Sequence, residues 1–417
     1  MLIDNTCYPS PLARSIAATF MLLWAITGMD SARAGDLETS IFSFSGFGTV
    51  GLVHSSEGQA DFTNSPSTKP NGAGYSRNWS GDVDSRLGLQ VTADLTPKLT
   101  AVLQVLAQQR YDNTYTPRVE WANVKYAITP DLSVRVGRIA MPTFLVGEYR
   151  NVSYAVPWVR PPVQLYGHMV PITSSDGVDA SYKVRISDVT NTLQVSYGGN
   201  EINSPNSKKP SQVKKVVGIF NALEYGAATF RMSYQEAKLT IGSVNDFLDL
   251  YRQFGPAGAA VAKKYMFDNR PISLVSLGAS YDPGKWFVMG EWGRGKFSSF
   301  VGTQTAWYGS GGYRMGDFTP YVVYSKSIKQ GDAFDAGVNS PYAAPLNRAL
   351  NELLKPATGT TRSIGSRWDF KKNAALKLQY DHVNLDARSS GSLLNIQAGY
   401  QPGGTFHVVS ATVDFVF

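Results

Sequence analysis

The sequence predicts an all-β protein, a transmembrane antiparallel up-and-down β-barrel of 16 strands with one inward-folded loop. Three observations predict this fold. Apolar and polar residues alternate over many segments of about ten residues. Short and long connections between those segments also alternate. The third observation is a segment rich in Pro, Gly and Tyr, residues 140–175, which has neither a helical nor a two-residue period.

The composition supports a single membrane-embedded unit. The chain has 417 residues, a net charge of +7 and only 17% charged residues. No run of 18 or more apolar residues follows the N-terminal region, so the sequence offers no spanning helix beyond it. No linker or charge block divides residues 35–417, which we expect to form one barrel domain.

Residues 1–34 have the pattern of an export signal peptide. Arg14 supplies the positive charge, residues 15–28 form a short apolar core, and Ala32-Arg33-Ala34 gives a small-residue cleavage site. The alternative is an uncleaved anchor, but the apolar core is too short for one. Cys7, the only cysteine, lies in this segment, so the mature chain is expected to have no disulfide and no thiolate metal site.

Five strands are predicted before the long segment. Residues 85–94 illustrate the pattern, because Leu87, Leu89 and Val91 alternate with Arg86, Gly88 and Gln90. The five strands cover residues 42–54, 85–94, 100–110, 119–129 and 132–138.

Eleven further strands are predicted after it, with a short helix near residues 244–254. These strands cover residues 177–185, 191–198, 214–224, 227–236, 272–281, 286–297, 303–315, 318–329, 360–370, 373–386 and 405–417. Connections after even-numbered strands are tight, whereas those after odd-numbered strands are mostly long. This is expected of a barrel whose two rims face different compartments. The sheet must close on itself, because no water is present in the hydrocarbon layer to hydrogen-bond the backbone N–H and C=O groups of an open sheet edge.

The segment 140–175 is predicted to be a packed loop that narrows the bore. Long structureless insertions in compact chains are usually functional or disordered, and the many prolines and aromatic residues here argue against a solvated tail.

Both ends of the predicted barrel show a family resemblance. The opening Phe44-Ser45-Gly46-Phe47-Gly48-Thr49-Val50-Gly51-Leu52 and the closing Thr412-Val413-Asp414-Phe415-Val416-Phe417 resemble those of general diffusion porins of Gram-negative outer membranes. In place of the Pro-Glu-Phe-Gly motif of that family's constriction loop, this sequence has Pro142-Thr143-Phe144. The resemblance implies homotrimers of water-filled channels, in outer-membrane lipid and lipopolysaccharide, that pass small hydrophilic solutes.

Candidate residues of the pore constriction follow from the resemblance together with parity, which here means the alternation of inward and outward side chains along each strand. They are Arg86, Arg110, Lys125 and Arg135 on the inward faces of strands two to five, and Glu148, Arg150 and Arg160 in the loop. Opposed charges across a narrow aqueous bore favour polar solutes, and the excess of cations predicts a mild anion preference. Inward carboxylates could reverse that balance; the candidates are Asp179, Glu291, Asp369 and Asp381. Alternatively, individual arginines pin the loop to the wall.

Other classes of function are less well supported. The four histidines are scattered without ligand spacing and no nucleophile motif occurs, so we expect no cofactor, no metal site and no enzyme. Lys and Arg are dispersed, which disfavours nucleic-acid binding. The alternatives are a porin selective for a sugar, phosphate or organic acid, a barrel-embedded hydrolase, and a secreted β-protein used for adhesion. Tyr149, Tyr154, Trp158 and Tyr166 leave the first of these open, because aromatic residues along a bore would mark it.

Overall fold

The computed structural model describes residues 41–169, 173–205, 207 and 209–417. The fold described below is that of the compact unit Phe42–Phe417. The predicted signal peptide, residues 1–34, lies outside the described residues.

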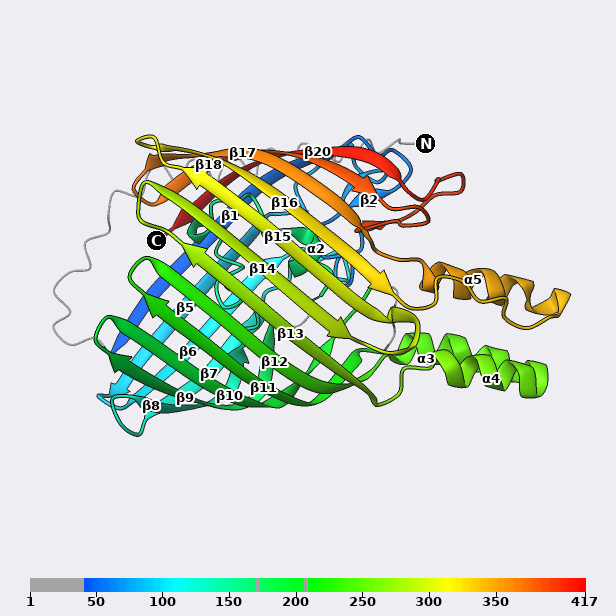
Figure 1. Cartoon of the computed structure of the whole chain (residues 1–417), viewed down its shortest axis with the longest axis horizontal. Coiled ribbons are helices and arrows are strands. Elements are labelled where there is room, and N and C mark those ends of the chain that lie inside the picture. The colour runs from blue at the N-terminus through cyan, green and yellow to red at the C-terminus, as the bar shows by residue number, and fades with distance from the viewer. Residues whose placement is uncertain (1–40, 170–172, 206, 208) are drawn as a thin grey trace, which may run out of the picture. The chain divides into compact units, whose positions relative to one another are not determined.

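Sixteen long strands in the described part of the chain form one closed antiparallel barrel (Figure 1). Closure is direct, because Thr49 of the first strand is in register with Arg86 on one side and with Asp414 of the last strand on the other. The predicted fold and strand number are therefore confirmed. The strands are β1 (Phe42–Ser55), β5 (Arg86–Thr96), β6 (Leu99–Gln108), β7 (Arg118–Ala127), β8 (Leu132–Ala140), β9 (Ser174–Ile186), β10 (Val189–Ile202), β11 (Ser211–Tyr225), β12 (Ala228–Thr240), β13 (Arg270–Tyr281), β14 (Trp286–Lys296), β15 (Thr303–Tyr313), β16 (Phe318–Gln330), β17 (Gly359–Lys371), β18 (Ala374–Leu385) and β20 (Gly404–Val416).

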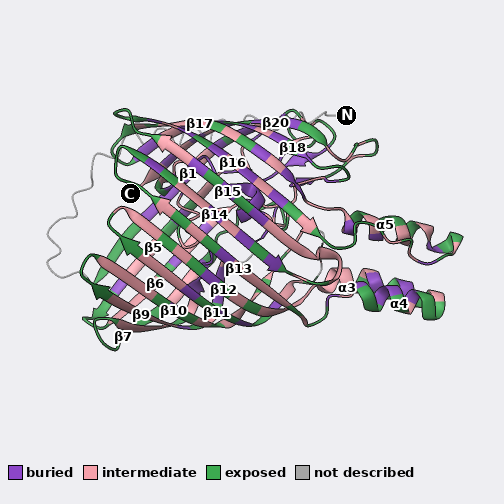
Figure 2. Cartoon of the chain, viewed as in Figure 1, coloured by how far each residue is buried: buried purple, intermediate pink, exposed green. Residues whose placement is uncertain are grey.

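Burial alternates along the strands, as the sequence pattern predicted (Figure 2). In β20, for example, Val408 and Ser410 are fully buried, whereas Val409 between them is exposed. The exposed residues of the strands are largely apolar, so the outer surface of the barrel is hydrophobic, as contact with lipid requires.

Exposed aromatic residues gather at the short-turn rim. The rings of Tyr281 and Trp286 lie 5.3 Å apart, and those of Phe318 and Trp368 are stacked at 5.6 Å. Each of these residues is at or near the short-turn end of its strand, which is the position of an interfacial aromatic girdle.

The long connections carry the remaining elements of the described chain. Three short strands form a small sheet that joins the first and last long links: β2 (Asp61–Phe62), β3 (Ala73–Gly74) and β19 (Leu393–Leu394). Strand β4 (Trp79–Ser80) adds to β1. The short helices are η1 (Ser153–Ala155), α2 (Val163–Tyr166), η3 (Ser299–Val301) and η4 (Pro341–Ala343). No helix among the described residues is both long enough and apolar enough to span a membrane.

Two long links build a helical lobe at the long-loop rim. The predicted helix near 244–254 is present as α3 (Gly242–Asp249) and η2 (Leu250–Phe254), which continue into α4 (Gly255–Tyr265). Helix α5 (Ala344–Leu354), in the link before β17, was not predicted. These helices share an apolar core that includes Leu248, Tyr251, Leu350 and Leu354. Helices this short depend on tertiary packing more than on local propensity, which is why α5 was missed.

Residues 141–169, the first described part of the link between β8 and β9, form a packed loop, as predicted. We call residues 141–169 the inward segment. It forms an apolar cluster with barrel-wall residues, including Phe144, Trp158 and Leu165 from the segment and Tyr308 and Tyr321 from the wall. Tyr308 is buried while the next residues on either side, Trp307 and Gly309, are exposed. The segment therefore contacts the inner face of the barrel.

Candidate functional site: a basic cavity beside the inward segment

Lys377 of β18 anchors the start of the inward segment's helical turns to the wall. Its Nζ donates hydrogen bonds to the carbonyl oxygens of Ser153 (2.6 Å), Val156 (2.8 Å) and Trp158 (2.9 Å). The same ammonium lies 2.8 Å from the Asp414 carboxylate, and both side chains are fully buried. A buried charge is tolerated because it is paired and hydrogen-bonded.

Glu291 of β14 holds the opposite side of the segment. Its carboxylate accepts hydrogen bonds from the Leu145 backbone N–H at 2.7 Å, the Tyr308 hydroxyl at 2.7 Å and the Tyr166 hydroxyl. Nearby, the Trp158 indole N–H donates to Ser310 Oγ of β15 at 2.8 Å. The inward segment is thus fixed to β14 and β15 by buried polar contacts as well as by apolar packing.

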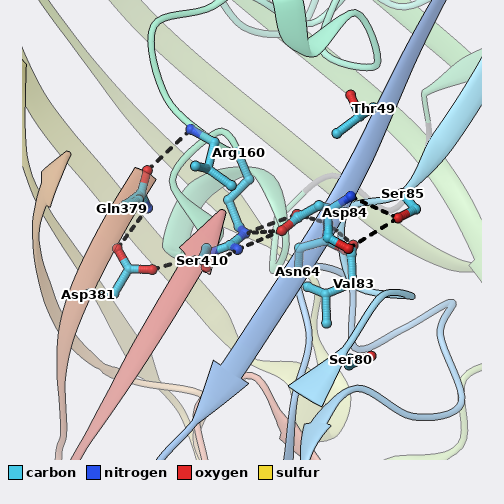
Figure 3. Close-up of polar contacts among 12 residues, drawn as sticks. Thr49, Asn64, Ser80, Val83, Asp84, Ser85, Arg160, Gln379, Asp381 and Ser410 are labelled. Carbon is cyan, nitrogen blue, oxygen red and sulfur yellow. Dashed lines mark hydrogen bonds and ion pairs between the residues drawn. The ribbon is translucent and has the colours of Figure 1, made fainter. Parts of the chain in front are cut away.

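Arg160 is the centre of a third anchor (Figure 3). Its guanidinium donates to the Asp84 carboxylate at 2.6 Å, to Asp381 at 3.1 Å and to Ser410 Oγ at 2.6 Å. It therefore ties the segment to β18, to β20 and to the link before β5. Burial of Asp84 favours its neutral form, but the ion pair with Arg160 outweighs this effect and lowers the pKa of Asp84.

A cavity of about 660 Å³ lies on the other side of the inward segment, toward β5–β11. It is strongly basic: among the described residues, eight lining side chains are cations and three are carboxylates. The cations are Lys69, Arg86, Arg110, Arg118, Arg138, Arg150, Arg160 and Lys214, and the carboxylates are Glu120, Asp176 and Glu201.

Four of the seven candidate constriction residues line this cavity: Arg86, Arg110, Arg150 and Arg160. Arg86 lies on β5, and its Nη1 donates to Asn151 Oδ1 of the inward segment at 3.3 Å. Arg110 lies two residues beyond the end of β6, so it belongs to the following link and not to the strand as parity suggested. Arg160 is 4% exposed and serves as an anchor, which is the alternative role considered from the sequence.

The structure does not bring the other three candidates to the cavity. Arg135 is paired with Asp179 of β9 at 2.6 Å. Lys125 is in register with Arg135 but is exposed, nearer the short-turn end of β7. Glu148 lies on the far side of the segment, 3.3 Å from Arg231 of β12.

Sequence reasoning missed four of the lining cations: Lys69, Arg118, Arg138 and Lys214. Arg118 and Arg138 lie near the long-loop ends of β7 and β8, so a search of strand ends could have found them. No local signal marks Lys69, which sits in the long polar link after β1. Burial and the nearby Arg86 lower the pKa of Lys69 to about 7, and its Nζ donates to the carbonyl oxygens of Asp82 and Val83, both at 2.8 Å.

The inward carboxylates that could have reversed the charge balance are engaged elsewhere. Asp179 pairs with Arg135, Asp381 with Arg160, and Asp369 with Arg367. Glu291 accepts the three hydrogen bonds described above. Within the described ranges, no group of three or more His, Cys, Asp or Glu side chains is placed to hold a metal ion.

A closed sheet with an apolar outer wall and a charged, partly open interior defines the class of outer-membrane channels. The family comparison agrees with this class. The chain belongs to the Gram-negative porin family, whose model matches residues 17–388. It is an outer-membrane β-barrel channel protein.

Solved structures show the same fold. OmpF of Salmonella typhi, in complex with daunomycin, is 13% identical with a TM-score of 0.52, over 90% of this chain and 97% of that one. An anion-selective porin from Comamonas acidovorans is 14% identical with a TM-score of 0.52, over 90% and 99%. The trimer form of OmpT, an outer membrane protein of Vibrio cholerae, is 11% identical with a TM-score of 0.50, over 90% and 99%. No curated protein matches the chain.

Proposed function

We propose that this porin is a water-filled channel for passive diffusion of small hydrophilic solutes and ions, with a mild preference for anions. In this proposal the inward segment narrows the bore, and solutes pass through the basic cavity beside it. The observation that carries the proposal is the excess of cations among the cavity's lining residues.

Ion pairs with carboxylates neutralise some of the cations that line the cavity, but not all of them. Arg118 lies 2.9 Å from Glu120, and Arg138 lies 2.7 Å from Asp176. Arg86, in contrast, donates to the neutral acceptors Asn151 Oδ1 and the Asp84 carbonyl oxygen. A passage lined by a net positive charge raises the local concentration of anions, and low-dielectric walls strengthen this effect. Because the passage is aqueous and salt screens the field within about 10 Å at 0.1 M, the preference is expected to be mild.

The test is the reversal potential of purified protein in planar bilayers under a salt gradient. We expect a potential of anion-selective sign, and we expect it to move toward zero in Arg86→Gln combined with Arg118→Gln. The matched control is Lys125→Gln, which removes a barrel cation away from the cavity and should have the smaller effect. Cation selectivity of the unmodified channel would overturn the anion preference.

A second candidate is a porin selective for phosphate or an organic acid. The dense cluster of arginines in the cavity favours an anionic substrate. A sugar-selective aromatic track gains less support, because Trp158 and Tyr166 are buried against the wall. Saturable block of the ion current by a small dicarboxylate or phosphate would favour this candidate, and an unsaturable concentration dependence would favour general diffusion.

We also propose that the protein has no catalytic activity and assembles as a homotrimer in lipid that includes lipopolysaccharide. Membership of the porin family supports a channel role, and the solved structures with this fold include a trimer form. Lipid hydrolysis by the purified protein would contradict the first statement. A detergent-corrected mass of one chain, measured by light scattering under conditions that preserve activity, would contradict the second.

A further inference from the structure

We propose that His382 and His407, on the outer face of the barrel, form a binding site for one divalent transition metal ion. We call these two side chains the histidine pair. The ion links β18 to β20, the last strand of the barrel, and water molecules complete its coordination. The proposal rests on the barrel fold and is independent of the selectivity proposed for the channel.

Strand register brings the two histidines together although they are far apart in the sequence. His382 of β18 is in register with His407 of β20, and the centroids of the two imidazole rings lie 5.1 Å apart. No spacing motif marks this pair, because it depends on how two strands align. The histidines therefore look scattered in the sequence, but two of them meet in the folded barrel.

The alternation of side chains shows that the histidine pair faces outward. Asp381, which precedes His382, pairs with Arg160 inside the barrel, and Val408, which follows His407, is fully buried. Successive side chains of a strand point to opposite faces of the sheet. Both imidazole rings are thus on the outer face, where they are half-buried.

The histidine pair lies where the outer surface changes from apolar to polar. Toward the long-loop rim, the next outward pair is Asn384 and Thr405, both exposed, and Asn384 Nδ2 donates to Thr405 Oγ1 at 3.1 Å. Toward the middle of the wall, the next outward pair is Tyr380 and Val409. Water and dissolved ions therefore reach the histidine pair from the rim side.

The spacing suits two imidazole ligands on one ion. Opposite Cβ atoms on antiparallel strands are about 4.5–5.5 Å apart. Zinc binds imidazole nitrogen at about 2.0–2.1 Å, which places two nitrogens on the same ion about 3–3.5 Å apart. Rings whose centroids are 5.1 Å apart reach this separation by small side-chain rotations, without a shift of the backbone.

Tyr380 orients the His407 ring for metal binding. Its hydroxyl lies 2.8 Å from His407 Nδ1, and its ring stacks with the imidazole at 5.7 Å. When Nδ1 carries the proton and donates it to this hydroxyl, the lone pair of Nε2 is free for the ion. Metal-binding histidines generally donate their other ring N–H in this way, which fixes the tautomer and the ring orientation.

The donor set selects the class of ion. Imidazole nitrogen suits Zn²⁺, Cu²⁺ and Ni²⁺, whereas Mg²⁺ and Ca²⁺ prefer oxygen ligands, and Cu²⁺ is expected to bind most tightly. Among residues that the structure describes, no third His, Cys, Asp or Glu side chain joins the pair in a metal-binding arrangement. The site therefore has two protein ligands.

One cation beside the histidine pair opposes binding. Arg362 of β17 is in register with His382, on the side away from His407. A guanidinium at this position repels a divalent cation, so its removal should tighten metal binding. An anion bound at the same place would instead lose affinity, and this difference in sign separates the two kinds of ligand.

His54 of β1 provides a matched control. It is half-buried like the histidine pair, and it is only diagonal to His407, because its register partner is Val409. Its ring stacks on Trp79 at 4.9 Å, and its Nδ1 donates to the Asn78 carbonyl oxygen at 2.8 Å. His54 is thus held by other contacts, and its replacement should leave metal binding unchanged.

The test is isothermal titration calorimetry of the untagged protein in detergent, with Zn²⁺, Cu²⁺ and Mg²⁺ as probes in a buffer that does not chelate metals. We expect one Zn²⁺ or Cu²⁺ per chain and no binding of Mg²⁺. The affinity for Zn²⁺ should fall at least tenfold in His382→Gln and in His407→Gln. It should stay unchanged in His54→Gln and rise in Arg362→Gln. Tyr380→Phe keeps the ring but removes the hydroxyl, and should weaken binding about tenfold.

Electron paramagnetic resonance of the unmodified protein with one equivalent of Cu²⁺ gives a second test that needs no variant. We expect hyperfine coupling to two imidazole nitrogens. Coupling to a single imidazole, or the absence of Zn²⁺ and Cu²⁺ binding, would overturn the proposal. Equal affinities of His382→Gln and His54→Gln would also overturn it, as would weaker Zn²⁺ binding in Arg362→Gln.

Discussion

Replacing Arg160 by Met tests whether the inward segment is held by its buried charge network. The substitution keeps much of the side-chain volume but removes the guanidinium that bonds to Asp84, Asp381 and Ser410. The two carboxylates are buried, with side chains 0% and 5% exposed, so the variant leaves both without their cation. The expected consequence is a less stable barrel or a detached inward segment.

The size of the effect follows from burial. Removing one partner of a buried ion pair costs about 3–5 kcal/mol, because the remaining charge stays desolvated. For a unit the size of Phe42–Phe417, an unfolding entropy of about 2.1 cal/mol/K per residue amounts to about 0.8 kcal/mol/K. The expected fall in Tm is therefore about 4–6 °C.

The assay is thermal unfolding in detergent, followed by circular dichroism, together with single-channel recording. If the segment stays docked, Tm falls by the stated amount; if it detaches, the conductance rises and becomes noisy. Arg110→Met is the matched control, because Arg110 lines the same cavity but, among the described residues, its carboxylate partner is Asp112, at 4.0 Å and partly exposed, and its other polar contact is the Thr116 carbonyl oxygen at 3.4 Å. Such a pair contributes about 0–1 kcal/mol. An Arg160→Met protein with the Tm and conductance of the control would refute the reasoning.

Three further predictions follow from other contacts. Because burial lowers the pKa of Lys69 to about 7, Lys69 becomes protonated as pH falls from 8 to 6, and the anion preference of the channel should rise over that range. Lys69→Met should remove this rise, whereas the control Lys214→Met should keep it. A reversal potential of the unmodified channel that does not change with pH would contradict the prediction. A Cβ at Gly48 would overlap the Phe415 ring where β1 pairs with β20, whereas a Cβ at Gly309 would meet open space. Gly48→Ala should therefore fold with lower yield and unfold in detergent at a lower temperature than Gly309→Ala. Equal yields and equal unfolding temperatures would argue against the contact between Gly48 and Phe415. Glu291→Ala leaves the Leu145 N–H and two tyrosine hydroxyls without their acceptor, at about 1–3 kcal/mol each, so a Tm equal to that of the unmodified protein would show that this anchor is dispensable.

The constriction candidates show how far parity alone can reach. Parity correctly assigned Arg86 and Arg135 to the inner face, because side chains alternate strictly along a strand. It could not decide that Arg135 is neutralised by Asp179 while Arg86 faces the cavity. Parity also fails beyond a strand end, as at Arg110. It says nothing about Lys69, whose position depends on how the link between β1 and β5 folds back on itself, so that Lys69 bonds to the Val83 carbonyl of the same link.

The sequence by itself determined the barrel, its sixteen strands and the existence of a packed segment after the fifth strand. These features are local, because they follow from the two-residue period within each strand and from the turn residues between strands. Lipid on one side of the wall and water on the other impose the two-residue period. Only the tertiary structure decided which side of the bore the inward segment occupies and which cations remain beside it. Those depend on contacts such as Arg160 with Asp381 and Lys377 with Trp158, between residues more than two hundred positions apart, and no local pattern encodes such pairings.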